Sequence, residues 1–286
     1  CGLSSTPSMF MSTVLPELGY DGAIMITASH LPFNRNGMKF FTKDGGLESK
    51  DIKVLLNKAI ALEENGIEEK EVQEIETVDL LKYYSANLRK IICNEVGSKE
   101  EDKPLAGLHF VVDASNGAGG FFATRVLEPL GADISGSIYL DPDGTFPNHV
   151  PNPEDEKAME CIRKATMENH ADLGIIFDTD VDRAATVFPS GKEINRNALI
   201  ALMASIVAQK MPGSTVVTDS VTSDQLEDFL VNRLGLKHHR FKRGYRNVIN
   251  ESIRLNGLGQ DSQLAIETSG HGAFKENYFL DDGAYI

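Results

Sequence analysis

One short stretch of the chain places three aspartates at alternate positions, Asp178, Asp180 and Asp182. They follow the apolar run 174–177, which predicts a buried strand that ends where this acidic loop begins. Carboxylate oxygens are the ligands that hard dications take. Carboxylates about 4 Å apart repel by roughly 1 kcal/mol in water and about 4 kcal/mol at a protein surface. A solvated acidic turn would leave that repulsion in place, so we expect these aspartates to hold a dication.

Two other loop types with alternating acidic residues agree less well with this stretch. An EF-hand calcium loop that began at Asp178 would need Gly at its sixth position and Glu at its twelfth. The chain has Arg183 and Pro189 there. A haloacid-dehalogenase-type phosphatase would have Asp-x-Asp-x-Thr/Val after a strand, usually early in the chain. The segment 178–181 begins in this way, but Asp182 follows it.

A single hydroxyl group, that of Ser29, follows another apolar run, 23–26, which predicts a short buried strand. Proteins of the α/β class usually place their chemistry at the carboxyl ends of strands. The polar loop 34–39 comes next, with a glycine turn and one cation, Lys39. Considered by itself, this stretch is equally consistent with an ordinary loop in which proline and glycine mark the turns.

A third group of polar residues, Glu267, Ser269 and His271, surrounds a glycine after the short apolar run 264–266. A carboxylate and a hydroxyl group suit the hydroxyl groups of a sugar. An imidazole can move a proton near neutral pH. A helix start capped by Ser269 would explain the same residues without any chemistry, so this stretch alone is a weak signal.

The three stretches, taken in this order, resemble the α-D-phosphohexomutase superfamily, the phosphoglucomutase/phosphomannomutase proteins. The similar segments are Thr27-Ala28-Ser29-His30-x-Pro32 for the phosphoserine loop, Asp178-x-Asp180-x-Asp182-Arg183 for the metal loop, and Glu267-x-Ser269-Gly270-His271 for the sugar-binding loop. The resemblance extends over essentially the whole chain.

This resemblance implies a role for each position. The metal Mg²⁺ would be held by Ser29, Asp178, Asp180 and Asp182. Ser29 would also carry the phosphoryl group, with His30 and Lys39 beside it. His271 would act as an acid or base. The substrate would be bound by Arg183, Lys242, Arg243, Glu267, Ser269 and His271.

The implied reaction moves phosphate between O1 and O6 of a hexose phosphate, through a hexose 1,6-bisphosphate that is both intermediate and activator. The resemblance leaves the hexose open among glucose, mannose and glucosamine. Family members have four domains, and we expect this chain to lack the start of the first domain and the whole fourth domain. An alternative is therefore a truncated, non-catalytic phosphosugar-binding or regulatory relative.

The chain departs from the family pattern at a few positions. Thr179 and Val181 stand between the aspartates where glycine is usual, Ile266 replaces a glycine before Glu267, and Leu31 replaces a common asparagine. Because β-branched residues resist unusual backbone angles, the conformation of the metal loop is in question, although its ligands are not.

Apolar periodicity and turn residues predict an α/β fold of successive domains, each with a mixed, mostly parallel sheet flanked by helices. We expect domains at 1–104, 105–192 and 193–286, with a linker at 97–104. Helices are predicted at 8–18, 51–65, 78–95, 121–130, 154–170, 193–211, 225–234 and 246–256, and further strands at 109–113, 134–140, 172–177, 214–218, 238–242 and 264–266. The apolar stripes of the helices at 51–65 and 78–95 are predicted to be core.

The glycine-rich turn after the strand at 109–113 could also start a nucleotide-binding unit. Its glycines, Gly117, Gly119 and Gly120, do not match G-x-G-x-x-G, so we expect a structural turn.

Composition bounds the partners and the compartment. The 286 residues carry a net charge of −14, which disfavours nucleic acid and anionic membranes as partners. No apolar run reaches the ~18 residues of a membrane helix. Three separated cysteines favour a reducing compartment. We expect the cytoplasm, or an organelle if a transit peptide precedes Cys1, and the sequence does not indicate an oligomeric state.

Overall fold

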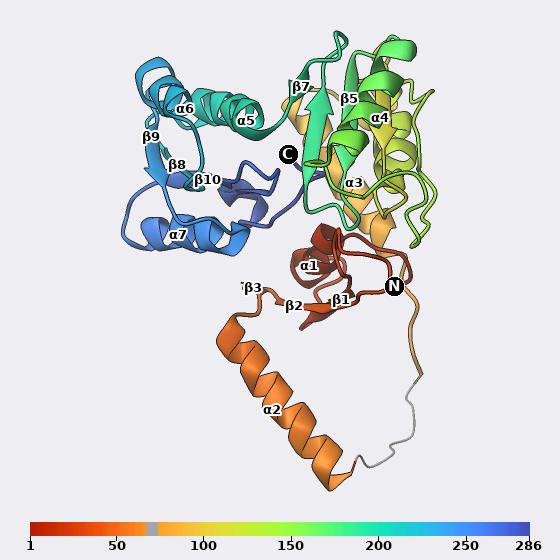
Figure 1. Ribbon diagram of the computed structural model, residues 1–286, viewed down its shortest axis with the longest axis vertical. Helices are drawn as coiled ribbons and strands as arrows, with labels where there is room; N and C mark the ends of the chain where they lie inside the picture. Colours follow the sequence, from red (N-terminus) through yellow and green to blue (C-terminus); the bar gives the residue numbers. More distant parts are fainter. Residues whose placement is uncertain (67–73) are drawn as a thin grey trace.

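The computed structural model describes residues 1–66 and 74–286. The described chain forms three lobes, each built around its own sheet (Figure 1). The first lobe lies below the other two, which stand side by side, and helix α2 (Ser49–Asn65) extends away from all three. The chain therefore has the α/β architecture of successive domains that the sequence predicts.

The first lobe has a small antiparallel sheet and one buried helix. Its elements are α1 (Thr6–Val14), β1 (Ala23–Ile26), β2 (Met38–Thr42) and β3 (Gly45–Gly46), with the strand order β1-β2-β3. Helix α1 begins earlier than predicted because Ser5 caps it, in a reciprocal pair of hydrogen bonds with Ser8. It also ends earlier, because Leu15 precedes Pro16 and takes an extended backbone.

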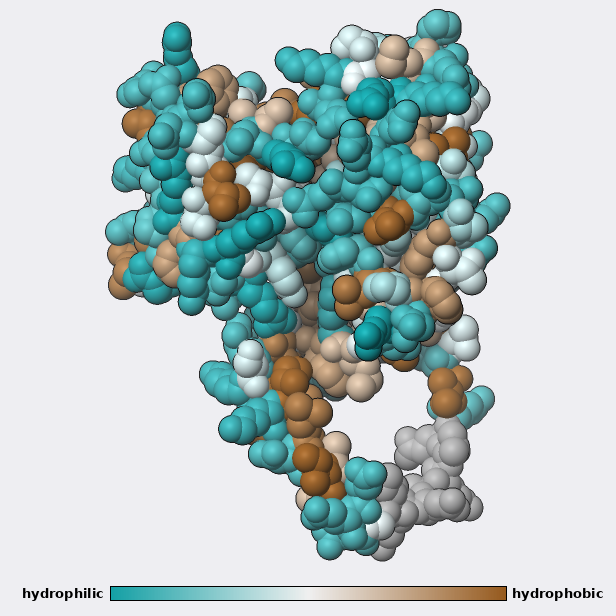
Figure 2. Space-filling view, in the orientation of Figure 1, coloured by the Kyte–Doolittle hydropathy of each residue, from teal (hydrophilic) through white to brown (hydrophobic). Residues whose placement is uncertain are grey.

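Helix α2 contradicts the prediction that its apolar stripe is core. None of its residues is buried, and the exposed apolar side chains are Val54, Leu55, Leu56, Ile60 and Leu62. Figure 2 shows this stripe as a brown band along the helix. One face of the nearby sheet is exposed as well, at Ile24, Ile26 and Met38. Periodicity identified an apolar face correctly, but no described element packs against it.

The second lobe has the strand order β4-β5-β6-β7. Its elements are α3 (Leu80–Glu95), the short 3₁₀ turn η1 (Glu100–Asp102), β4 (Phe110–Asp113), the π-helix η2 (Phe122–Leu127), the 3₁₀ turn η3 (Glu128–Leu130), α4 (Glu156–Glu168), β5 (Leu173–Phe177), β6 (Ala184–Val187) and β7 (Glu193–Ile194). Strands β4 and β5 are parallel, and the other pairs are antiparallel. The apolar stripe of α3 is buried, as predicted.

Three local predictions in this lobe differ from the structure. The predicted helix 121–130 consists of the π-helix η2 and the 3₁₀ turn η3, and Pro129 in η3 cannot donate the hydrogen bond of a continuing helix. The predicted strand 134–140 is reduced to one isolated bridge, between Ile138 and Asp113, and Gly136 takes a left-handed backbone (φ 79°) that a strand does not have. The predicted linker 97–104 contains η1.

The third lobe has the strand order β11-β10-β8-β9. Its elements are α5 (Arg196–Lys210), β8 (Thr215–Thr218), α6 (Asp224–Asp228), the π-helix η4 (Phe229–Arg233), β9 (Lys237–Arg240), α7 (Tyr245–Gly257), β10 (Ser262–Ile266), β11 (Gly272–Phe274) and the 3₁₀ turn η5 (Lys275–Asn277). Strand β8 is parallel to both β9 and β10, whereas β10 and β11 are antiparallel. The sheets of the second and third lobes are mixed, as predicted, whereas the described sheet of the first lobe is antiparallel throughout, so parallel pairing is less extensive than predicted.

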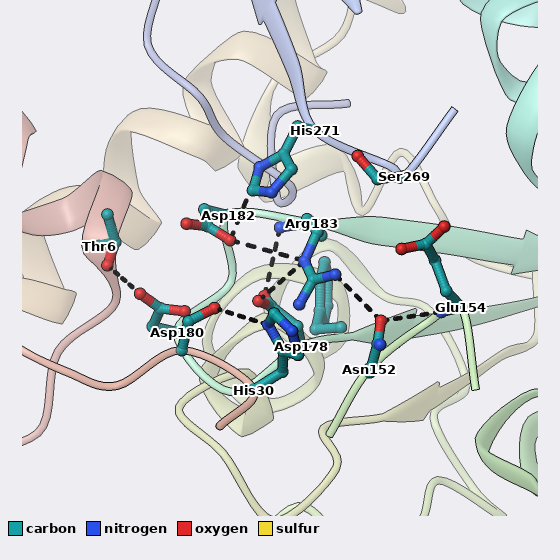
Figure 3. Close-up of polar contacts among 12 residues, drawn as sticks. Thr6, His30, Asn152, Glu154, Asp178, Asp180, Asp182, Arg183, Ser269 and His271 are labelled. Atoms are coloured by element: carbon teal, nitrogen blue, oxygen red, sulfur yellow. Dashed lines mark hydrogen bonds and ion pairs between the residues drawn. The ribbon is translucent and has the colours of Figure 1, made fainter. Parts of the chain in front are cut away.

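The cores explain how the lobes hold the loops between them. The first and second lobes share one apolar cluster that includes Phe10, Tyr84 and Phe177, whereas the third lobe has its own around Ile200 and Leu264. The loops that follow β1, β5 and β10 all face the junction of the lobes (Figure 3).

Within the described part of the chain, no helix combines the length and apolar character needed to span a bilayer.

Candidate active site

The acidic loop after β5 is folded so that its three aspartates converge. Asp178, Asp180 and Asp182 are buried, and each offers a carboxylate oxygen within 4.8 Å of the others. Val181 takes a left-handed backbone (φ 66°) and is fully buried. Such a conformation costs of order 1–3 kcal/mol in a residue other than glycine. The loop therefore adopts the unusual angles even with a β-branched residue, and the surrounding structure stabilises it.

Lys39 on β2 reaches into this loop from the first lobe. Its Nζ donates to Asp180 Oδ2 at 2.9 Å and to Asp182 Oδ2 at 2.7 Å. Burial opposes the charge of Lys39, but the two carboxylates outweigh burial and raise its pKa above the usual range. Burial also opposes the charge of Asp182, yet Lys39 lowers the pKa of that carboxyl. Burial and the neighbouring aspartates raise the pKa of Asp178.

The loop retains acceptor atoms that lack a hydrogen-bond donor among the described residues. Asp180 Oδ1 and Asp182 Oδ1 are buried and accept no hydrogen bond from the described residues. A buried, unpaired carboxylate oxygen is costly. Oxygen donors of this kind suit Mg²⁺. The residues present therefore fit a dication, with Lys39 supplying the compensating charge in this structure.

The serine loop after β1 lies against the acidic loop. Ser29 has a left-handed backbone (φ 52°), and its Oγ is 3.3 Å from His30 Nδ1. Ser29 and Asp180 line one cavity of about 290 Å³. His30 lies close enough to the acidic loop for the charges of Asp180 and Asp182 to act on its ring (Figure 3). Burial and the charge of Arg183 lower the pKa of His30. The hydroxyl group of Ser29 and one carboxylate of the acidic loop thus line one cavity, and the imidazole of His30 lies next to that hydroxyl group.

The side chain of Arg183 is held in place by hydrogen bonds to neighbouring residues. It is buried, its Nε donates to Asp178 Oδ2 at 3.2 Å, and its Nη1 donates to Asn152 Oδ1 at 3.0 Å (Figure 3). Its Nη2 is buried and has no partner among the described residues. Arg183 thus holds Asp178 in place, and one guanidinium nitrogen remains available for a ligand.

The loop after β10 is joined to the basic loop 242–244. Glu267 Oε1 accepts from Gly244 N at 2.6 Å, and Ser269 Oγ donates to Glu267 Oε2 at 3.4 Å. Burial raises the pKa of Glu267. Lys242 and Arg243 are exposed. The third lobe therefore brings hydrogen-bonding groups and two cations, all predicted to bind substrate, into adjacent loops.

His271 connects this loop to the acidic loop. Its Nδ1 is 2.6 Å from Asp281 Oδ2 and 3.9 Å from Asp182 Oδ1, and its ring stacks on Tyr245 at 4.8 Å. Burial opposes its protonation, but Asp281 and Asp182 raise its pKa to about 9. A backbone bridge also pairs His271 with Arg183. The predicted sugar and metal loops are thus in direct contact.

Sequence reasoning missed several residues that position these groups. They are Thr6, which donates to Asp180 Oδ2, Asn152 beside Arg183, Asp281 beside His271, and Asp219, whose Oδ2 accepts from Thr268. The adjacent acids Asp281 and Asp282, after two apolar residues, could have drawn attention. Thr6 and Asn152 carry no comparable local signal.

Comparisons with known proteins agree with this geometry. Family models of phosphoglucomutase/phosphomannomutase match in order, with alpha/beta/alpha domain I at residues 1–70, domain II at 82–191 and domain III at 195–286. A phosphomannomutase/phosphoglucomutase of Pseudomonas aeruginosa is 32% identical over 286 residues, which are 99% of this chain and 57% of that protein. A phosphoglucomutase of Neisseria meningitidis is 30% identical over 285 residues, with the same coverage of 99% and 57%.

A solved structure gives the same result. The phosphoglucomutase/phosphomannomutase family protein of Burkholderia thailandensis superimposes with a TM-score of 0.78 at 28% identity, over 99% of this chain and 58% of that one. The chain thus spans a little under three-fifths of the relatives it matches. With three family domains matched in order over nearly its whole length, the chain belongs to the α-D-phosphohexomutase superfamily, in its phosphoglucomutase/phosphomannomutase family.

Proposed function

We propose that this chain forms the catalytic part of a phosphohexomutase that moves phosphate between O1 and O6 of a hexose phosphate. One observation supports this most strongly. The hydroxyl group of Ser29 lines the same cavity as Asp180, in an acidic loop that retains two buried carboxylate oxygens without a hydrogen-bond donor among the described residues. Such a site suits a phosphoserine that is held against a dication, because both the phosphate and the carboxylates are anionic.

In this proposal Ser29 carries the phosphoryl group, and Asp178, Asp180 and Asp182 hold Mg²⁺. When bound, Mg²⁺ would neutralise charge on the phosphoryl oxygens during transfer. Lys39 already lies at the loop, so its ammonium group can donate to a phosphoryl oxygen once the carboxylates have another cation. We assign Lys39 and His30 to the two sides of the transferring group.

His271 is the proposed acid and base. Its Nδ1 is held by Asp281, which leaves Nε2 for a hydroxyl group of the sugar. Asp182 is one of the two carboxylates that raise the pKa of His271, so a dication bound to Asp182 would lower that pKa and allow the ring to act as a base. In the first half-reaction that hydroxyl group of the sugar loses its proton to the base and its oxygen bonds to phosphorus. The bond from phosphorus to Ser29 Oγ breaks with its electron pair left on Oγ, which takes up a proton to give the serine hydroxyl group. The resulting 1,6-bisphosphate turns around, and the reverse steps at its other phosphate restore phosphoserine. Hexose 1,6-bisphosphate is accordingly both the intermediate and the activator.

Sugar recognition is assigned to the third lobe. Glu267 and Ser269 offer an acceptor and a hydroxyl group that already contact each other, so either orientation of the sugar meets the same pair. Lys242 and Arg243 supply positive charge for the phosphosugar on an otherwise acidic chain. Arg183 Nη2 is a further donor toward the substrate.

The test is turnover by the protein as its gene encodes it. Glucose 1-phosphate, mannose 1-phosphate and N-acetylglucosamine 1-phosphate would be supplied with MgCl₂ and glucose 1,6-bisphosphate, and formation of the 6-phosphates followed. We expect turnover of at least one substrate, its loss in Ser29→Ala, and its retention in the exposed-turn control Ser190→Ala. Binding of the phosphosugars without any turnover would favour the non-catalytic alternative.

A further inference from the structure

The segment 281–284 of the third lobe crosses to the acidic loop of the second lobe. The backbone N of Gly283 donates to Val181 O at 3.0 Å, in the residue with the left-handed backbone between Asp180 and Asp182. The approach is so close that a Cβ on Gly283 would lie 2.6 Å from the carbonyl carbon of Arg183. A glycine is therefore needed here, and the segment supports the strained part of the loop.

Asp282 anchors this segment through a buried set of hydrogen bonds. The hydroxyl group of Tyr84 on α3 donates to Asp282 Oδ1 at 2.6 Å, and the backbone N atoms of Ala284 and Tyr285 donate to the same oxygen at 3.1 Å. Asn277 Nδ2 donates to Asp282 Oδ2 at 3.1 Å. Tyr84 is 0% exposed and Asp282 is 1% exposed. The segment is thus tied to a helix of the second lobe.

A buried tyrosine–carboxylate pair is not the most stabilising way to fill a core. Well-packed apolar residues of similar volume often serve stability equally well or better. The polar pair has directional geometry instead, so it fixes one position of the segment relative to α3. The preceding residue, Asp281, holds His271, and the following residue, Gly283, holds Val181. One anchor therefore fixes the supports of both loops.

We propose that Tyr84 and Asp282 are positioning residues, which hold the segment 281–284 against the acidic loop and so set the geometry of its dication site. This inference rests on the proposed function, because it takes the acidic loop as the Mg²⁺ site. Neither residue touches the metal or the substrate in this account, and both act through Gly283 and Asp281.

The test measures Mg²⁺ binding by titration calorimetry with MgCl₂ alone, on the protein as its gene encodes it. Tyr84→Phe removes only the buried hydroxyl group. Groups that bond a metal ligand directly typically change metal affinity by about 10- to 100-fold, and Tyr84 acts from further away, through Asp282 and Gly283, so we expect a Kd higher by roughly three- to tenfold. Tyr285→Phe is the matched control, since within the described ranges its hydroxyl group bonds Glu276 alone, which is exposed. The separate variant Asp282→Asn should retain most of the wild-type affinity for Mg²⁺, because its amide oxygen can still accept from Tyr84.

The outcomes separate this inference from the proposed function. A Tyr84→Phe protein that unfolds at a lower temperature, yet binds Mg²⁺ within about twofold of the wild type, would show a purely structural tyrosine and overturn the inference. A wild-type protein that binds Mg²⁺ but turns over no phosphosugar would refute the proposed mutase function, and the result for the positioning residues would still stand. A wild-type protein that binds no Mg²⁺ would overturn both.

Discussion

Replacing Lys39 by methionine should destabilise the protein mainly when Mg²⁺ is absent. Lys39 is the partner of two carboxylates whose side chains are only 1% and 3% exposed. Removing one partner of a buried ion pair costs about 3–5 kcal/mol, because the remaining charge stays buried. The lysine side chain is itself 26% exposed, so water screens part of the interaction. We therefore expect a loss of about 3 kcal/mol, at the lower end of that range.

Mg²⁺ should restore most of that stability, because a dication can neutralise the carboxylates in place of the ammonium group. We expect the deficit to fall to about 1 kcal/mol at saturating Mg²⁺. Such a recovery of about 2 kcal/mol requires the variant to bind Mg²⁺ about thirtyfold more tightly than the wild type, since 1.4 kcal/mol is a factor of ten. Tighter binding by a variant that has lost a predicted catalytic residue is a result that simple misfolding does not produce.

The assay is urea unfolding in EDTA and in excess MgCl₂, combined with calorimetric titration of Mg²⁺. Lys43→Met is the matched control, because Lys43 lies beyond the end of the same strand and is exposed. The control should lower stability by less than about 0.5 kcal/mol in both conditions. Equal losses for Lys39→Met with and without Mg²⁺, together with an unchanged Kd for the metal, would refute the reasoning.

Three further predictions follow from the contacts. Gly117→Ala should weaken Mg²⁺ binding severalfold in calorimetry, because its Cβ would lie 2.4 Å from Thr179 O, whereas Gly144→Ala, with open space around it, should not. Burial opposes the charge of His149, but the buried carboxylate of Asp113 outweighs burial and raises the pKa of His149. The stability that this histidine contributes should therefore be complete below about pH 6.5 and disappear as pH rises through the raised pKa. Urea unfolding of His149→Gln should lack this decline. Leu56→Glu should change urea stability by less than about 0.5 kcal/mol, since α2 buries nothing, and a loss above about 2 kcal/mol would show that its apolar face is covered.

The residues that could be predicted from sequence are those whose partners are close in the chain. Asp178, Asp180 and Asp182 share one loop, so their spacing alone indicated convergence, and the structure brings their oxygens together. Glu267 and Ser269 are likewise in contact within one turn. Local order of this kind is set by a strand end and a few backbone angles, which the residue types constrain.

The remaining contacts depend on how the lobes pack, and periodicity carries no such information. Thr6 meets Asp180 across 174 positions, and Arg183 meets Asn152 across 31. The apolar stripe of α2 shows the same limit, here for a contact that was predicted and is absent among the described residues. Its spacing correctly predicted an amphipathic helix, but nothing in the spacing states what covers the apolar face, and here no described residue does.

The central claim, a phosphoserine at Ser29, is tested most directly by the intact mass of the protein purified from its native host. The account predicts a species heavier than the unmodified chain by about 80 Da, with the phosphate located on Ser29 by fragmentation. Incubation with glucose 6-phosphate should exchange that phosphate. The added mass should be absent in Ser29→Ala and present in Ser190→Ala. A native protein with no phosphate on Ser29, before or after incubation with glucose 1,6-bisphosphate, would contradict the account.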